Sequence, residues 1–140
     1  MADGHGFSCA ATLDAVRLLA GFLQTTLQKA DVPEAARIDL ELAVVEAANN
    51  IVLHGVDGRS GMTIALSVRN VPGGIEVALE DAGTAIPSHL LDVVAQAGPE
   101  AECGRGLGLI AACTDRVNYT SSGGRNRLVL FKALQPGTAA

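Results

Sequence analysis

The sequence predicts an α+β fold, a two-layer α/β sandwich in which helices cover one face of a mixed, mostly antiparallel sheet. Apolar residues recur at helical spacing over 12–29 and 33–55. They alternate with polar residues in two predicted hairpins, 62–80 and 117–134. The chain has 140 residues, and about 100–200 residues is usual for one domain, so a single domain over residues 1–140 is expected.

The predicted order begins with a weak strand and two helices. Alternation over 7–11 indicates the strand, and Thr12 is the expected N-cap of the first helix. The periodic apolar residues of that helix are Leu13, Val16, Ala20, Leu23 and Leu27. A second helix starts at Pro33 and ends at Gly55. Its periodic apolar residues are Ile38, Leu42, Val45 and Val52.

The second half of the chain is predicted as a hairpin, two short helices and a second hairpin. Alternation over 62–80 around a Pro-Gly-Gly turn predicts a hairpin with one buried face. The short helices are Ser88–Ala97 and Leu107–Thr114. The last hairpin covers 117–134 and turns at the glycine pair 123–124.

Composition excludes several classes of function. Ten Lys and Arg against fifteen Asp and Glu give a formal charge of −5, which argues against binding through nucleic acid phosphates. No apolar run approaches the roughly 18 residues of a membrane span, and the first residues do not resemble a signal peptide. Cys9, Cys103 and Cys113 are never spaced as CxxC, so neither a disulfide framework nor a Cys-rich zinc site is indicated. We expect a soluble, cytoplasmic protein that binds neither nucleic acid nor membrane.

Three polar residues lie four apart on the second predicted helix. Glu46, Asn50 and His54 therefore share one side of a helix rich in Ala, Val, Ile and Leu. A pocket would explain them, because an amide oxygen suits Mg²⁺ and a carboxylate one turn away can accept a hydroxyl proton. Two alternatives stay open: this side of the helix is more exposed to solvent than the pattern suggests, or the side chains form hydrogen bonds with nearby backbone. For His54, a structural or dipole role at the helix end is favoured over ligation.

An acidic turn follows the strand that ends near Glu80. Asp81 can accept a hydrogen bond from an exocyclic amine such as that of adenine, and Gly83 would let the backbone come close to the ring. Ile86 completes the candidate nucleotide-binding residues of this turn. A plain turn is the alternative, since Asp and Gly are usual turn residues.

A run of glycines opens the predicted helix 107–114. Successive glycines let backbone N–H groups converge, and a helix N-terminus adds positive potential, so the run can hold a phosphate. The candidate binding residues are Gly104, Arg105, Gly106, Leu107 and Gly108. A dinucleotide fingerprint would need glycine in place of Leu109, and a Walker A loop would need Gly-Lys-Ser/Thr, so both fail. A flexible linker remains the alternative.

In order and content, the three motifs resemble those of the Bergerat-fold ATPases, the superfamily of gyrase B, MutL and the histidine kinases. The sequence is most similar to the small RsbW- and SpoIIAB-type anti-sigma factor serine kinases. Val44–Gly55 resembles their N box and Asp81-Ala82-Gly83 their first glycine box. Gly104–Leu109, followed by Asp115-Arg116-Val117, resembles the second. The resemblance covers about residues 7–134, which makes the chain a single histidine-kinase-like ATPase domain.

The resemblance implies a role for each motif. Asn50 would hold Mg²⁺ bridging the ATP phosphates, Asp81 would bind the adenine amine, and Glu46 would be the general base for a serine hydroxyl. The glycines at 104, 106 and 108 would wrap the phosphates at the base of a lid over Ser88–Cys103. Magnesium and ATP are therefore the expected cofactors.

The resemblance also implies partners. The family's substrate is a serine on a STAS-domain antagonist, and its other partner is a sigma factor bound by a homodimer. We expect the homodimer surface over Phe7–Leu27. Ala85 stands where the superfamily's motif commonly has a second glycine; if a positive φ were required there, its Cβ would cost about 1–2 kcal/mol.

Three functions compete. The first is a protein serine kinase that also acts as an anti-sigma, partner-switching regulator; the second is an ATP-binding sequestration module whose phosphotransfer is vestigial. The third is a histidine-kinase catalytic domain separated from its sensor. That function lacks a phospho-acceptor helix, since His5, His54 and His89 lie at the N-terminus, in the N box and in the lid. Glu46 favours the first, because binding alone needs no base.

Overall fold

The computed structural model describes residues 4–55, 61–86 and 105–134 of the chain. The elements in chain order are β1 (Gly4–Ala10), α1 (Leu13–Lys29), α2 (Glu34–Asn50), the π-helical turn η1 (Ile51–Gly55), β2 (Thr63–Val71), β3 (Gly74–Asp81), α4 (Arg105–Ala112), β4 (Arg116–Ser122) and β5 (Arg125–Ala133). This succession follows the predicted one. The predicted helix over Ser88–Ala97 lies outside the described residues.

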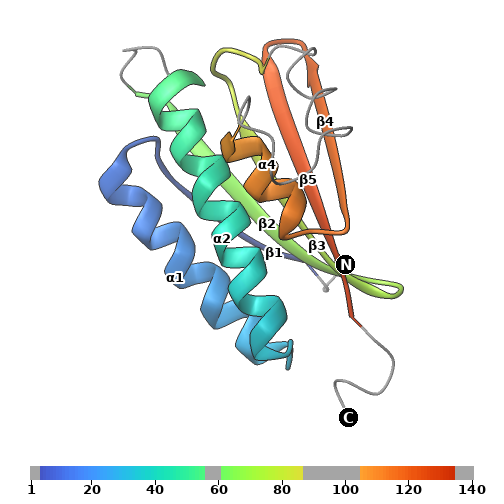
Figure 1. Cartoon of the computed structure of the whole chain (residues 1–140). Helices are drawn as coiled ribbons and strands as arrows, with labels where there is room; N and C mark the ends of the chain where they lie inside the picture. Colours follow the sequence, from blue (N-terminus) through green and yellow to red (C-terminus); the bar gives the residue numbers. More distant parts are fainter. Residues whose placement is uncertain (1–3, 56–60, 87–104, 135–140) are drawn as a thin grey trace.

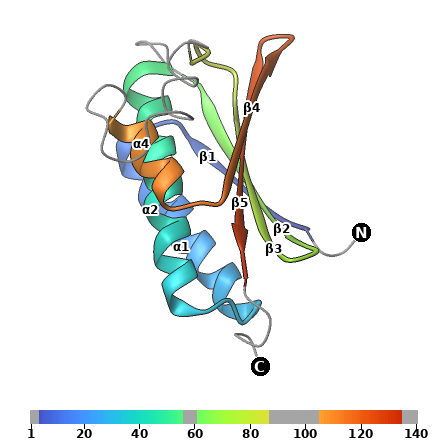
Figure 2. The same cartoon turned by 45° about the vertical axis from the view of Figure 1, so that its right-hand side comes forward.

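The five strands form one sheet in the order β1-β2-β3-β5-β4, and α1, α2 and α4 cover one of its faces (Figure 1, Figure 2). The predicted two-layer α+β sandwich is confirmed. All four pairings are antiparallel, so the described sheet contains no parallel pair and is not mixed. Between β1 and β2 the chain passes through two antiparallel helices, which return it in the direction opposite to β1. The other antiparallel connections include two tight hairpins.

Glycine makes both hairpin turns possible. Gly73 has φ of 85° in the turn between β2 and β3, and Gly123 and Gly124 have φ of 61° and 79° between β4 and β5. Two consecutive positive φ values suit a two-residue turn whose twist matches that of the strands. Both predicted hairpins are confirmed, with Ile64, Leu66 and Val68 of β2 buried as the alternation requires.

The first helix follows its predicted limits, but the predicted buried faces are partly wrong. Thr12 caps α1, since its Oγ1 accepts a hydrogen bond from the Ala15 backbone N at 3.2 Å. Leu13, Ile38 and Leu42 are 53%, 51% and 46% exposed, although the periodicity placed them inside. On α2 the buried residues are Ala36, Leu40, Ala43, Val44, Ala47 and Ala48. Small alanine side chains let α2 pack closely against its neighbours. The alanine-rich stripe of α2 is therefore buried, and the stripe with the bulkier Ile38 and Leu42 is exposed.

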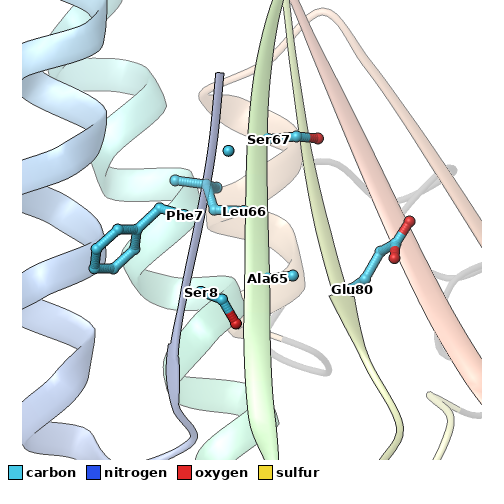
Figure 3. A pocket seen from close by; sticks show the side chains of 7 residues that line it. Phe7, Ser8, Ala65, Leu66, Ser67 and Glu80 are labelled. Atoms are coloured by element: carbon cyan, nitrogen blue, oxygen red, sulfur yellow. The ribbon is translucent and has the colours of Figure 1, made fainter. Parts of the chain in front are cut away.

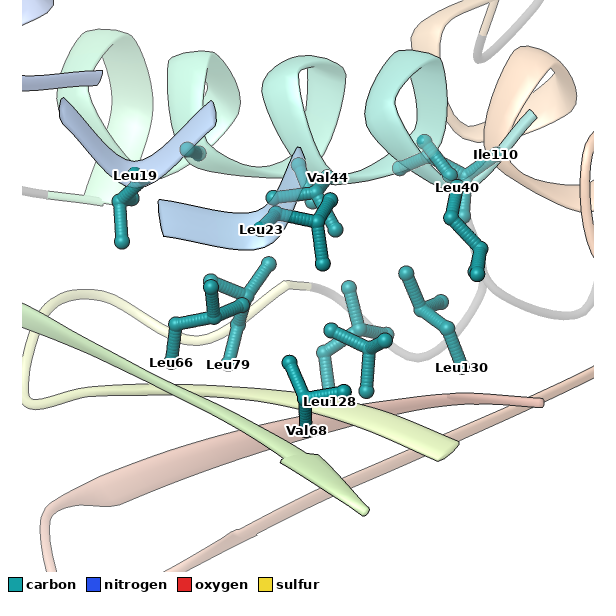
Figure 4. Close-up of a cluster of buried hydrophobic side chains, with 14 of the residues drawn as sticks. Leu19, Leu23, Leu40, Val44, Leu66, Val68, Leu79, Ile110, Leu128 and Leu130 are labelled. Atoms are coloured by element: carbon teal, nitrogen blue, oxygen red, sulfur yellow. The ribbon is translucent and has the colours of Figure 1, made fainter. Parts of the chain in front are cut away.

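The core lies between the helices and the sheet (Figure 4). Leu19, Leu23, Leu40 and Val44 extend from the helices toward the leucines and valines of β2, β3 and β5. This packing joins the layer of helices to the sheet. No helix within the described residues is long and apolar enough to cross a membrane.

Candidate functional site

Glu46 and Asn50 lie one turn apart in the last two turns of α2, as predicted. Both residues are half-buried. Within the described part of the chain, neither side chain makes a hydrogen bond or an ion pair. The described residues therefore do not support the alternative in which these side chains bond nearby backbone. The two groups remain available to a ligand.

His54 lies beyond the end of α2. The α-helix ends at Asn50 and the chain proceeds through η1, a π-helical turn in which hydrogen bonds run five residues back. The predicted common side therefore applies within α2 to Glu46 and Asn50, and for His54, which lies in η1, it stays a prediction. The His54 side chain is exposed.

Asp81 ends β3 and is buried, with 8% of its surface exposed. Its Oδ1 accepts hydrogen bonds from the Gly83 backbone N at 2.7 Å and from Asn126 Nδ2 at 3.0 Å. Its Oδ2 accepts no hydrogen bond from any described residue. The plain-turn alternative accounts for the bond to Gly83, but it leaves the second oxygen of a buried carboxylate without a protein donor in the described residues.

Gly83 allows the acidic turn to touch the end of η1. A Cβ on Gly83 would lie 2.4 Å from the Gly55 carbonyl oxygen and 2.7 Å from its carbon. The Thr84 backbone N donates to the same oxygen at 2.7 Å. Glycine is thus required by a backbone-to-backbone contact, and close approach of a ring to Gly83 stays a prediction. The contact joins the end of the N box to the Asp81 turn.

The residues after Gly83 are held by β4. The Ile86 backbone N donates to Tyr119 Oη at 3.0 Å. Burial, and then the negative charge of Asp81, raise the pKa of Tyr119, while the bond from Ile86 lowers it. Ala85 has no positive φ, because Asp31 is the only non-glycine residue of the described chain in that region. The conditional strain expected at Ala85 is therefore absent.

Sequence reasoning missed Tyr119 and Asn126. Asn126 is 3% exposed and donates from Nδ2 both to Asp81 Oδ1 and, at 2.9 Å, to the Gly83 carbonyl oxygen. One signal was available: Asn126 precedes the buried Leu128 and Leu130 at a spacing of two. A strand places such residues on one face, so an asparagine was predictable on the buried side of β5.

The glycine run enters the helix earlier than predicted. α4 begins at Arg105, so Arg105, Gly106, Leu107 and Gly108 form its first turn, and Gly108 is buried. Packing of α4 against α2 outweighs the low helix propensity of glycine. Gly104 and the lid over Ser88–Cys103 lie outside the described residues. Phosphate binding by this run stays a prediction.

The three motifs lie toward the same end of the molecule, where α2 and β3 end and α4 begins (Figure 1, Figure 2). Among the described residues, no three His, Cys, Asp or Glu side chains gather as a metal site. This fits Mg²⁺ held by an amide oxygen together with substrate phosphates, since Mg²⁺ seldom uses an all-protein cage. The buried Asp81, whose Oδ2 accepts no hydrogen bond from the described residues, fits an amine of a purine base.

A shallow depression lies on the opposite, open face of the sheet (Figure 3). It is lined by Gly6, Phe7, Ser8, Ala65, Leu66, Ser67 and Glu80. Successive side chains of a strand point to opposite faces, so Glu80 faces this depression and Asp81 faces the helices. Glu80 forms ion pairs with Arg127 and Arg125 at 2.6 and 3.5 Å. The depression is separate from the three motifs.

Comparisons with known proteins agree with this geometry. Among curated proteins, none matches the sequence. Of 14 solved chains that match, one contains the RsbU and RsbW domains of Rv1364c from Mycobacterium tuberculosis, with 19% identity and a TM-score of 0.67 over 95% of this chain. This chain spans only 33% of that one. The SiaB-SiaC complex from Pseudomonas aeruginosa matches with 15% identity and a TM-score of 0.62, over 93% of this chain and 89% of that one.

At these identities the solved structures are similar in fold, and they agree with the predicted Bergerat-type architecture. The family comparison goes further. A model described as the histidine kinase-like ATPase domain matches residues 9–132, which is most of the chain. The chain belongs to the family of histidine kinase-like ATPase domains.

Proposed function

We propose that the protein is an ATP-dependent protein serine kinase that phosphorylates a STAS-domain antagonist and acts in partner switching. The observation that carries the proposal is the buried Asp81, whose Oδ2 has no donor in the described residues. Asp81 ends β3, and β3 ends at the same end of the fold as α2, which carries Glu46 and Asn50 in its last two turns (Figure 1). The family of this domain implies ATP binding.

Each residue has a distinct task in the proposed site. Asp81 Oδ2 accepts a hydrogen bond from the exocyclic amine of adenine, and the first turn of α4 offers backbone N–H groups to phosphate. Asn50 is the protein ligand for Mg²⁺. When bound, Mg²⁺ and ATP supply a transferable γ-phosphoryl group with part of its charge neutralised. Glu46 accepts the proton of the attacking serine hydroxyl.

Glu46 suits the role of base better than the other carboxylate considered on α2. Asp39 Oδ2 accepts a hydrogen bond from Lys132 Nζ at 2.8 Å, so that carboxylate is engaged with β5. Asp39 also lies two turns before Glu46, away from the Asp81 end. Glu46 is half-buried and free of protein partners within the described residues.

The partners follow from the resemblance to RsbW-type kinases. They are a STAS-domain antagonist that carries the acceptor serine, a sigma factor, and a second copy of the chain through Phe7–Leu27. The solved structures support a role in protein assemblies, since one contains an RsbW domain and the other is a SiaB-SiaC complex. In this proposal the protein and its partners act in the cytoplasm.

The second candidate is a binding module that sequesters its partner in the ATP-bound state without transferring phosphate. Both functions use Asp81 and Asn50, and only the kinase requires Glu46. The availability of the Glu46 carboxylate favours the kinase.

The test is phosphoryl transfer from radiolabelled ATP to purified STAS-domain proteins of the same organism. Transfer by the wild type should fall by about 10²–10⁴-fold in Glu46→Gln, the usual contribution of general base catalysis, with little change in ATP affinity. Glu41→Gln, on the same helix, is the matched control and should transfer at the wild-type rate. Wild-type levels of transfer by Glu46→Gln would remove Glu46 from the mechanism. ATP binding without any transfer would favour the sequestration module.

A further inference from the structure

Two buried polar side chains face each other across neighbouring strands. Asp81 on β3 and Asn126 on β5 are directly paired in the sheet register, and they are 8% and 3% exposed. Of the described residues, only Thr26 joins them as a buried polar or charged residue. A buried polar group without a hydrogen bond is destabilising, so the partners of this pair indicate what it does.

The Asn126 amide is fully used. Its Nδ2 donates to Asp81 Oδ1 at 3.0 Å and to the Gly83 carbonyl oxygen at 2.9 Å. Its Oδ1 accepts a hydrogen bond from Ser121 Oγ at 2.7 Å. A rotated amide would place its oxygen against a carboxylate and a carbonyl, so these neighbours fix its orientation. Asn126 itself has no donor left for a ligand.

Asn126 also determines which oxygen of Asp81 remains available. Oδ1 already accepts from Gly83 and Asn126, and no described cation pairs with this carboxylate. The two bonds to Oδ1 restrict rotation of the carboxylate and leave Oδ2 as the oxygen that a ligand can use. An ionised carboxylate oxygen is an acceptor only, so it can bond a 6-amino purine and meets the carbonyl of a 6-oxo purine unfavourably.

We propose that Asn126 is a positioning residue that sets selectivity for 6-amino over 6-oxo purines by orienting Asp81. The proposal rests on the proposed nucleotide site at Asp81. Asn126 acts through Asp81 and the Gly83 carbonyl, and it does not itself touch the base. Selectivity should therefore depend on Asn126 only while the Asp81 carboxylate is present.

The test measures the affinities of the full chain for ATP and inosine triphosphate, which differ at the 6-position of the base. The wild type should prefer ATP by about 10–150-fold, the range for a hydrogen bond to a charged group. Asn126→Ala should reduce this ratio to about 3-fold or less, because a mobile carboxylate loses most of that bond. In an Asp81→Asn background, adding Asn126→Ala should change the ratio by less than about 2-fold, as expected when one residue acts through the other.

Two further variants keep the result interpretable. Asn118→Ala removes an exposed asparagine from the adjacent strand and should leave the ratio unchanged. Ser121→Ala removes only the bond to Asn126 Oδ1 and should partly lower the ratio of ATP to inosine triphosphate affinity. If Asn126→Ala does not fold, Ser121→Ala tests the role of Asn126 in its place. A wild-type ratio in Asn126→Ala, or in Ser121→Ala when Asn126→Ala is unfolded, overturns the inference. An equal loss with and without the Asp81 carboxylate overturns it too. A wild type that binds neither nucleotide refutes the proposed function itself, and the inference with it.

Discussion

Replacing Gly83 with alanine tests the contact that joins the N box to the acidic turn. The added Cβ would lie 2.4 Å from the Gly55 carbonyl oxygen, about 1 Å inside the ordinary contact distance, and both neighbours are backbone. Relief requires the turn to move away from η1. That movement breaks the bond from Thr84 N to Gly55 O, worth about 0.5–1.5 kcal/mol. Overpacking strain adds about 1–3 kcal/mol.

Gly83→Ala should therefore lower the free energy of unfolding by about 1.5–4.5 kcal/mol, the sum of these two effects. Thermal unfolding followed by circular dichroism measures the change, which is at least about 5 °C in Tm for a domain of this size. ATP affinity should fall as well, because Gly83 N bonds Asp81 Oδ1 and Asn126 bonds Gly83 O.

For the matched control, the expected change in folding stability has the opposite sign. Gly21 lies exposed in the interior of α1, and a Cβ there would meet nothing within 4 Å. Gly21→Ala should stabilise the protein by about 0.5–1 kcal/mol, since glycine disfavours helix. If Gly83→Ala unfolds at the wild-type temperature and binds ATP normally, the tight contact between Gly55 and Gly83 does not exist in the protein and the reasoning fails.

Three other predictions concern Asp81, Tyr119 and the first helix. Asp81→Asn should weaken ATP binding by about 1.5–3 kcal/mol in calorimetry, the worth of a hydrogen bond to a charged group, and unchanged affinity would contradict its role. Because burial raises the pKa of Tyr119 above its ordinary value of about 10, folding stability should fall as pH rises above about 10. Tyr119→Phe should remove this loss of stability and keep the loss that starts at lower pH from the half-buried thiol of Cys9 and the buried thiol of Cys113, whose pKa values burial also raises. Leu18 on α1 is 59% exposed and lies within the proposed homodimer surface. Leu18→Glu should therefore give monomers in sedimentation at about 20 μM, whereas the control Leu42→Glu on α2 should stay dimeric at that concentration. A monomeric wild type would refute the dimer.

The sequence supported most of the fold because its strongest signals are local. Thr12 caps α1 as predicted, and the alternation in β2 identified the buried face correctly. The buried face of α2 was not predictable from spacing, since alanines and larger apolar residues form competing stripes. Ile38 and Leu42 are exposed because close helix packing selects the alanines.

Those site residues could be predicted that are recognised from the spacing within one helix or strand. The spacing placed Glu46 and Asn50 on one side of α2, and the end of β3 indicated Asp81. The partners of Asp81 come from distant parts of the chain: Asn126 is 45 residues away in sequence. Only the strand register, with β5 beside β3, shows that the two side chains meet. The contact that requires Gly83 depends likewise on where η1 ends.

Wild-type nucleotide binding tests the central claim most directly, namely that the end of α2, the Asp81 turn and the start of α4 form one ATP site. Calorimetry with the purified chain should show one ATP per chain in the presence of Mg²⁺ and weaker binding when Mg²⁺ is removed. It should also show at least about 10-fold weaker binding of GTP, because a 6-oxo purine offers no amine to Asp81. Equal affinity for ATP and GTP would contradict the role of Asp81, and no binding of ATP would contradict the site as a whole.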